Sequence, residues 1–130
     1  APCSGSGTWR RNPDLKWQFN PTDLDEVLAA QKSILQSAAR LVKPGGRLIY
    51  ATCSIFREEN EMQVDNFLRN VNDCDKNLSE FKVVCAKKIW DKNTHSGDSE
   101  NVSYLSIAPH KDGVDGFFAA VFERNATKPK

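Results

Sequence analysis

The feature that most constrains the fold is the run Arg47-Leu48-Ile49-Tyr50-Ala51-Thr52, which leads directly into Cys53. Its apolar character predicts a buried strand. Pro44-Gly45-Gly46 before it is a helix-stop and turn signal, and the acidic stretch 57–61 after it suits the positive end of a new helix. The local order is therefore helix, strand, loop, helix. Ligands of open α/β sheets bind beyond the carboxyl ends of the strands, so we expect Cys53 at that edge.

Apolar residues at helical spacing lie on both sides of this strand. We expect a first helix over residues 23–42 with Thr22 as its N-cap, and an apolar stripe of Leu24, Val27, Leu28, Ile34, Leu35, Ala38 and Leu41. A second helix is expected over residues 58–71, with an apolar side of Val64, Phe67, Leu68 and Val71. The first stripe is suited to packing on a sheet face.

The second half of the chain contributes further strands. Val83-Val84-Cys85 indicates a strand within residues 81–90, and Tyr104 to Ile107 is a shorter extended piece in an otherwise polar stretch. Phe117 to Phe122 is the most apolar run and predicts a central strand with neighbours on both sides. We therefore expect an α/β fold, half of a doubly wound sheet with flanking helices, over residues 1–124, followed by a flexible tail at 125–130.

Composition narrows the class of protein. A chain of 130 residues suits one domain, and its 39% hydrophobic and 27% charged residues are typical of soluble globular proteins. Membrane insertion is not expected because no apolar run approaches the roughly 18 residues that a span needs. The net charge of +1 gives no global attraction to nucleic acid, so affinity for RNA must come from local clusters such as Arg10-Arg11.

The four cysteines, at positions 3, 53, 74 and 85, are widely spaced. Their spacing fits neither a compact disulfide framework nor a paired metal-binding motif, so we expect reduced thiols, no metal and a cytoplasmic location. The chain begins Ala1-Pro2-Cys3 without an initiator methionine, and we interpret it as a piece of a longer protein.

Cys3 and Cys53 are the candidates for chemistry. Each lies where we expect a strand to give way to a loop, and one helix separates them in sequence. A right-handed crossover makes two such strands neighbours, so the two thiols are expected to face one crevice.

Four groups of residues carry a resemblance to a known family. They are Ala-Pro-Cys-Ser-Gly-Ser-Gly-Thr at 1–8, Arg-Arg-Asn-Pro-Asp-Leu-Lys-Trp at 10–17, Pro-Gly-Gly to Thr-Cys-Ser at 44–54 with Glu58-Glu59-Asn60, and Asp-Gly-Phe-Phe at 115–118. In this order they resemble the RNA cytosine-C5 methyltransferases of the Sun (RsmB-like) type. The resemblance implies that the chain is the C-terminal half of a Rossmann-like methyltransferase that uses S-adenosylmethionine. It also implies an RNA substrate, with ribosomal RNA favoured over transfer RNA.

The same resemblance implies roles for individual residues. Cys53 would be the nucleophile that adds to carbon 6 of cytosine and so activates carbon 5, and Cys3 would assist product release. Attack requires the Cys53 thiolate, which a helix N-terminus near Glu58 would favour. Arg10 and Arg11 would either contact RNA phosphates or order the site.

The cofactor site is expected to lie largely outside this chain. The family's glycine-rich first motif, the acidic residue that holds the ribose and the acidic residue that holds the cytosine all precede Ala1. The resemblance therefore predicts that the isolated chain is inactive and binds S-adenosylmethionine weakly or not at all without its N-terminal part.

Three alternatives remain open on sequence grounds. Cys3 is the nucleophile in one variant of the reaction, because a Pro-Cys motif performs that task in DNA cytosine methyltransferases. A non-enzymatic RNA-binding or scaffold module would keep the fold without cofactor binding. A thiol redox protein would cycle through a Cys3–Cys53 disulfide, although the sequence has no close cysteine pair.

Overall fold

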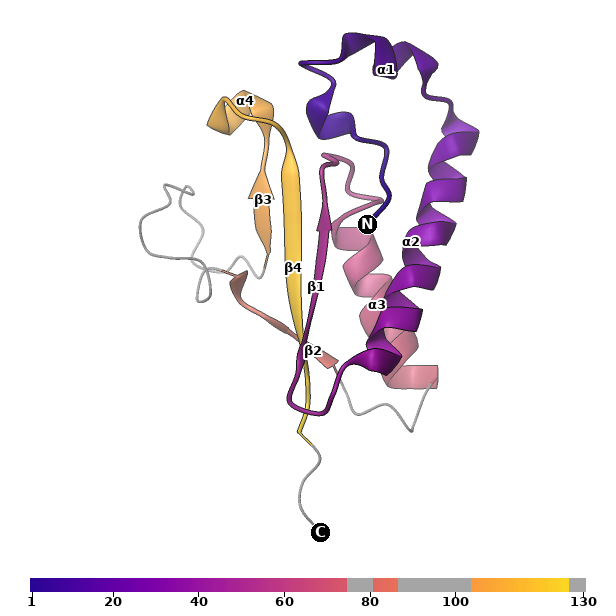
Figure 1. Ribbon diagram of the computed structural model, residues 1–130, viewed down its shortest axis with the longest axis vertical. Helices are drawn as coiled ribbons and strands as arrows, with labels where there is room; N and C mark the ends of the chain where they lie inside the picture. The colour runs from indigo at the N-terminus through magenta and orange to yellow at the C-terminus, as the bar shows by residue number, and fades with distance from the viewer. Residues whose placement is uncertain (75–80, 87–103, 127–130) are drawn as a thin grey trace.

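A long central strand organises the sheet in the computed structural model, which describes residues 1–74, 81–86 and 104–126 (Figure 1). This strand, β4 (Phe117–Arg124), pairs antiparallel with β1 (Arg47–Thr52) on one edge. On its other edge it pairs antiparallel with β2 (Phe81–Val84) and β3 (Leu105–Ile107). The prediction of a central strand at 117–122 is therefore confirmed.

The register of β1 against β4 places their alternate side chains on opposite faces. Leu48 faces Phe122 and Thr52 faces Phe118, and these residues point toward the core. Arg47 pairs with Glu123 on the other face, where the Glu123 carboxylate lies 3.4 Å from Arg47 Nε and 3.2 Å from Lys82 Nζ. These two cations lower the pKa of Glu123, with Lys82 as the larger influence.

Two helices, α2 (Pro21–Leu41) and α3 (Glu61–Cys74), lie together beside the sheet in Figure 1. Their apolar sides and the inner face of the sheet form one core, as expected from the helical spacing. The buried members of this core are Leu35, Ala39, Tyr50, Val64, Phe67, Val71, Phe81, Phe118, Ala120 and Phe122.

Helix α2 is the first of the two predicted helices, and it differs from the prediction in two ways. It begins at Pro21 after Asn20, whose backbone N–H donates to Asp23 Oδ2 at 2.9 Å, so Thr22 is not the N-cap. Proline is well suited to the first helical position because its missing N–H has no intrahelical partner there. The predicted stripe also includes the exposed Leu41, which is 86% accessible, whereas the polar Gln31 is completely buried.

Helix α3, the second of the predicted helices, begins at Glu61 rather than at residue 58. The preceding residues Glu59 and Asn60 are buried, 0% and 4% accessible, and their side chains bond to loops outside the helix. The acidic stretch therefore does more than complement the dipole of α3.

The N-terminal segment contains two short helices ahead of the predicted ones. It contains η1 (Ser6–Thr8) and α1 (Pro13–Gln18), and a short α4 (Pro109–Asp112) precedes β4. The start of the chain runs beside β1, because the Ala1 amino group donates to the carbonyl oxygen of Ala51 at 2.9 Å. Figure 1 shows η1 and α1 at the same end of the sheet as the end of β1.

An aromatic cluster holds this segment against the rest of the molecule. The Trp9 ring centroid lies 5.8 Å from that of Phe19 and 5.6 Å from that of Phe56, the second contact being edge-on. Such pairs add to the stabilisation from apolar burial. The N-terminal segment is therefore tied to the loop that follows β1.

Three of the predicted segments lie partly outside the described residues. They are the tail, of which 127–130 is not described, the strand predicted within residues 81–90, of which 87–90 is not described, and the polar stretch before Tyr104, of which 91–103 is not described. In the described ranges, none of the helices has the length and apolarity that crossing a membrane requires.

Candidate active site

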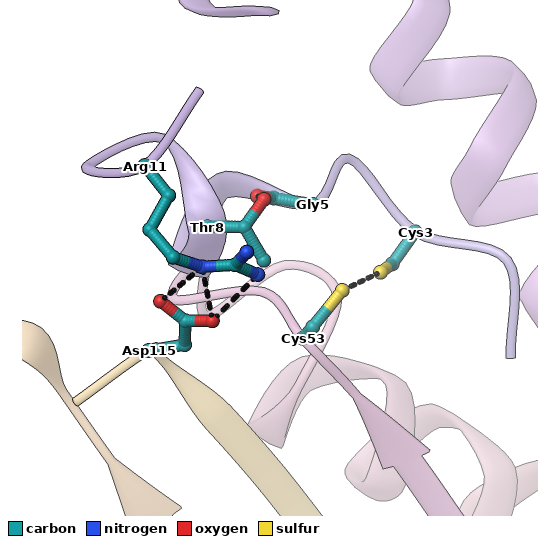
Figure 2. Close-up of polar contacts among 6 residues, drawn as sticks. All are labelled: Cys3, Gly5, Thr8, Arg11, Cys53 and Asp115. Atoms are coloured by element: carbon teal, nitrogen blue, oxygen red, sulfur yellow. Dashed lines mark hydrogen bonds and ion pairs between the residues drawn. The ribbon is translucent and has the colours of Figure 1, made fainter. Parts of the chain in front are cut away.

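The structure brings Cys3 and Cys53 together. Cys53 follows the last residue of β1, and Cys3 lies in the segment that precedes η1 (Figure 2). Their sulfur atoms are 3.2 Å apart, a hydrogen-bonding contact, and both side chains are half-buried. The two thiols therefore lie side by side, as predicted. Their chemical roles stay predictions.

The Cys53 thiol resists ionisation in this setting. Burial is the main cause that raises its pKa to about 11, followed by the hydrogen bond and charge of Cys3, with Glu59 adding to the effect. The sequence predicts that a helix N-terminus near Glu58 favours the Cys53 thiolate. Helix α3 begins only at Glu61, and the pKa of Cys53 is raised rather than lowered. At neutral pH the site therefore holds a Cys53 thiol.

The carboxylate of Glu59 is buried and bonds to both cysteine loops. Its Oε1 accepts from the backbone N–H of Ser4 at 2.7 Å and from Gln31 Nε2 at 3.2 Å. Its Oε2 accepts from the Ser4 hydroxyl at 2.6 Å and from the hydroxyl of Ser54. Four donors match the acceptor capacity of one carboxylate, which explains how this group is tolerated at 0% accessibility.

The turn that carries Cys53 is braced by side chains on both sides. The Thr52 hydroxyl donates to Asn60 Oδ1 at 2.6 Å, and Asn60 Nδ2 donates to the carbonyl oxygen of Ser54 at 2.9 Å. Ser6 Oγ accepts from the backbone N–H of Ile55 at 3.0 Å and lies 3.0 Å from Ser54 Oγ. The hydroxyl residues on either side of Cys53 therefore hold its backbone in place.

Glycines allow the N-terminal loop to lie directly against this turn. The backbone N–H of Gly7 donates to the carbonyl oxygen of Cys53 at 2.9 Å, and Gly116 N–H donates to Gly7 O at 2.8 Å. A Cβ at position 7 would lie 2.6 Å from the carbonyl oxygens of both Cys53 and Gly116. Only a residue without a side chain fits at this contact.

The two predicted RNA-binding residues are in different situations. Arg11 Nε donates to both carboxylate oxygens of Asp115, at 3.1 and 2.8 Å, and its Nη2 lies 2.8 Å from Oδ2 (Figure 2). This pair joins the N-terminal segment to the residue before Gly116. Arg10 is exposed and lies between η1 and α1 in the chain.

Sequence reasoning missed the polar residues that join the two cysteine loops, which are Ser4, Gln31, Ser54 and Glu59, together with the Arg11 partner Asp115. A signal was present, because Ser4 and Ser54 directly follow the cysteines and Glu59 lies in the Glu-Glu-Asn motif. We interpreted that motif as a helix start, and nothing in the local pattern indicates that one of its carboxylates points inward. Within the described ranges, no three His, Cys, Asp or Glu residues gather closely enough to hold a metal ion.

Comparison with known proteins identifies the relatives of the chain. A family model described as "16S rRNA methyltransferase RsmB/F" matches residues 1–123. The ribosomal RNA small subunit methyltransferase B of Pectobacterium atrosepticum is 38% identical over 125 residues, which are 96% of this chain and 25% of that protein. The chain thus spans about a quarter of the length of the curated relatives it matches.

Solved structures agree with the fold. The crystal structure of PH0851 superposes with a TM-score of 0.76 and 40% identity, and it covers 95% of this chain and 25% of its own. The structure of NSun6 from Pyrococcus horikoshii with SFG superposes with a TM-score of 0.70 at 22% identity, over 98% of this chain and 29% of its own. This arrangement of sheet and helices is therefore part of a Rossmann-like methyltransferase fold, as the sequence motifs implied.

Proposed function

The chain belongs to the 16S rRNA methyltransferase RsmB/F family, and we propose that it is the cysteine-bearing part of an enzyme that methylates carbon 5 of a cytosine in RNA, ribosomal rather than transfer RNA. The observation that carries this proposal is the 3.2 Å contact between the sulfurs of Cys3 and Cys53 at the end of β1. Two thiols in contact suit a reaction that both forms and breaks a covalent bond to the base.

The proposed chemistry assigns Cys53 to bond formation. Its thiolate adds to carbon 6 of cytosine, and the ring becomes an enamine whose carbon 5 is nucleophilic. In the longer protein, S-adenosylmethionine would supply the methyl group as a sulfonium donor and leave as S-adenosylhomocysteine. Carbon 5 would then lose its proton to a base, and the electrons of that C–H bond would reform the ring double bond as Cys53 Sγ leaves carbon 6 as a thiolate. Cys3 is placed beside that sulfur and serves this release step.

The geometry limits how the base can enter. Sulfurs that are 3.2 Å apart leave no room for a ring between them, so the pyrimidine lies beside the pair, on the side where the thiols are accessible. Because the pKa of Cys53 is raised to about 11, the proposed attack requires a change at the site that favours the thiolate. A positive charge brought to the site with the donor acts in that direction.

We propose that the cofactor site lies largely outside the described residues. Glu59, the buried carboxylate at the cysteine loops, is occupied by four donors and is not available to hold a ribose hydroxyl. We therefore propose that the residues that bind S-adenosylmethionine precede Ala1 in the longer protein. The reaction needs reduced thiols and RNA, and a cytoplasmic location provides both.

RNA contact is proposed for Arg10, whose exposed guanidinium can pair with a phosphate. Arg11 already pairs with Asp115, which favours the site-ordering role that the sequence left open. Its side chain is 58% accessible, so it remains able to approach RNA while it holds the loop.

The test compares two single variants of the full-length enzyme in RNA methylation. Cys53→Ala is expected to abolish methyl transfer, whereas Cys3→Ala is expected to retain a first methyl transfer and leave the RNA covalently attached. The reversed pattern would assign the nucleophile to Cys3. Calorimetry with S-adenosylmethionine, on this chain and on the full-length protein, separates a catalytic fragment from a non-enzymatic module, because only the enzyme gains cofactor binding with its N-terminal part.

A thiol redox function is a second candidate, favoured by the same sulfur contact. The sequence had argued against it because the cysteines are far apart in the chain, yet they are adjacent in space. The two thiols would lose two electrons and two protons to a disulfide oxidant such as oxidised glutathione. This function predicts a Cys3–Cys53 disulfide that forms and is reduced reversibly. It also predicts that the full-length protein transfers no methyl group.

A further inference from the structure

Both neighbours of Cys3 in the chain are bound to one buried polar network. The carbonyl oxygen of Pro2 accepts from Gln31 Nε2 at 2.9 Å, and Ser4 donates its backbone N–H and its hydroxyl to the two oxygens of Glu59. Gln31 also donates to Glu59 Oε1 at 3.2 Å. Cys3 is therefore held from both sides by groups that are hydrogen-bonded to each other.

The same carboxylate reaches the loop of the other cysteine. Glu59 Oε2 accepts from the hydroxyl of Ser54, the residue that follows Cys53. Ser54 Oγ in turn accepts from the backbone N–H of Phe56 at 3.0 Å, which shapes the turn after β1. One oxygen atom thus accepts from the residues that follow Cys3 and Cys53, segments that are 50 positions apart in sequence.

We propose that Glu59 is a positioning residue that sets the separation of the two sulfurs and so allows Cys3 to act on the adduct at Cys53. This inference rests on the proposed function. Glu59 has no hydrogen bond to either sulfur among the described residues, so it acts through Ser4 and Ser54 rather than on the base. Its own backbone is fixed by Tyr50, whose hydroxyl donates to Glu59 O at 2.5 Å from the buried side of β1.

The charge of Glu59 supports a positioning role over a catalytic one. A carboxylate beside Cys53 contributes to raising the pKa of that thiol, which opposes nucleophilic attack. The burial of Glu59 at this place is best explained by the two cysteine loops that its hydrogen bonds hold together. The four hydrogen bonds to Glu59 join the N-terminal segment, α2 and the turn after β1 at a single point.

A direct test measures the sulfur separation without using the methylation reaction. Phenylarsine oxide binds two neighbouring thiols, forming two As–S bonds with loss of one water, and its capture by the full-length protein reports on how closely they lie. Glu59→Gln keeps the size of the side chain but removes the charge and one acceptor oxygen. We expect it to weaken capture by roughly tenfold or more, the effect of leaving a buried donor without its partner.

Controls separate positioning from general destabilisation. Cys3→Ala must abolish capture at this site, which identifies the thiols that are measured. Val71→Ala opens a cavity in the core at α3, away from the cysteine loops, and is expected to lower the melting temperature without weakening capture. Ser4→Ala removes one donor and keeps the carboxylate, so it carries the test if the Glu59 variants do not fold.

A second readout follows the reaction itself. If Glu59 positions Cys3, Glu59→Gln accumulates methylated RNA attached to the protein, as Cys3→Ala does, while the first methyl transfer persists. The inference would be overturned if Glu59→Gln captured phenylarsine oxide as well as the wild type does and accumulated no attached RNA. Failure of Cys3→Ala to trap RNA would instead count against the proposed function, and the arsenical measurement would still decide the role of Glu59.

Discussion

The backbone N–H of Gly116 donates to the carbonyl oxygen of Gly7 at 2.8 Å, so the loop before β4 lies directly on the N-terminal loop. Gly7 in turn donates to the carbonyl oxygen of Cys53. This chain of two hydrogen bonds connects three segments that are far apart in sequence. It places the candidate nucleophile where the N-terminal loop, the turn after β1 and the start of β4 meet.

Gly7→Ala is expected to destabilise the full-length protein by about 1–3 kcal/mol, the usual effect of overpacking. The added Cβ would lie 2.6 Å from two backbone oxygens, and backbone atoms cannot move aside as a flexible side chain can. Denaturant unfolding measures the change. Gly113→Asn is the matched control, because a Cβ at position 113 would have nothing within 4 Å and Asn tolerates the left-handed backbone there, at φ 67°. Equal stability of Gly7→Ala and the wild type would contradict the described contact.

Arg11 and Asp115 are expected to act as a unit. Arg11→Ala and Asp115→Asn each remove the same ion pair, so each should slow methylation of RNA to a similar degree. The double variant should be little worse than either single one, since the interaction is lost only once. Steady-state kinetics of the full-length enzyme measures these effects. Additive losses would show that the two residues act independently, and a larger loss for Arg11→Ala than for Asp115→Asn would show a separate contribution of Arg11, such as a contact to RNA.

Arg10→Ala is expected to weaken RNA binding without changing the rate at saturating RNA. One lost phosphate contact reduces the slope of log affinity against log salt concentration by about one at most. Filter binding over a range of salt concentrations measures that slope, and Lys82→Ala, at the sheet face near Glu123, serves as a control of equal charge change. An unchanged slope for Arg10→Ala would remove Arg10 from the RNA-binding surface.

The pKa of Cys53 predicts how its reactivity depends on pH. A thiol with a pKa of about 11 is almost fully protonated at neutral pH, so its alkylation by iodoacetamide should be slow there and should rise about tenfold per pH unit until pH approaches 11. Cys3→Ala is expected to shift this profile to lower pH, because the Cys3 thiol is one of the groups that raise the pKa. Mass spectrometry of the Cys53 peptide measures the rate. A profile that levels off near the ordinary thiol value of 9.0 would contradict the prediction.

The strand leading to Cys53 was predictable because its signals are local. A proline and two glycines precede an apolar run, and the observed bounds of β1, Arg47–Thr52, match the predicted ones. The central position of β4 likewise follows from its continuous apolar sequence, which favours a strand with neighbours on both edges.

The residues that organise the site were not predictable in the same way. Glu59 looks like any acidic residue before a helix, and its inward direction depends on Ser4 and Gln31, which are supplied by distant segments. Gln31 similarly interrupts an apolar stripe, and the pattern alone does not show that a polar residue occupies the buried position. Polar groups become interior only through partners that tertiary structure provides. The family resemblance identified the two cysteines, but only the structure shows that their sulfurs are in contact.

The central claim is that the two sulfurs serve one reaction, with Cys53 bonded to the base and Cys3 required for its release. The most direct measurement incubates full-length Cys3→Ala with RNA and S-adenosylmethionine and maps the trapped nucleotide by mass spectrometry of the digested complex. The account predicts a methylated cytosine attached to the peptide that contains Cys53, and no attachment when Cys53 is also replaced by Ala. Attachment through any other residue, or free methylated RNA released at the wild-type rate, would contradict it.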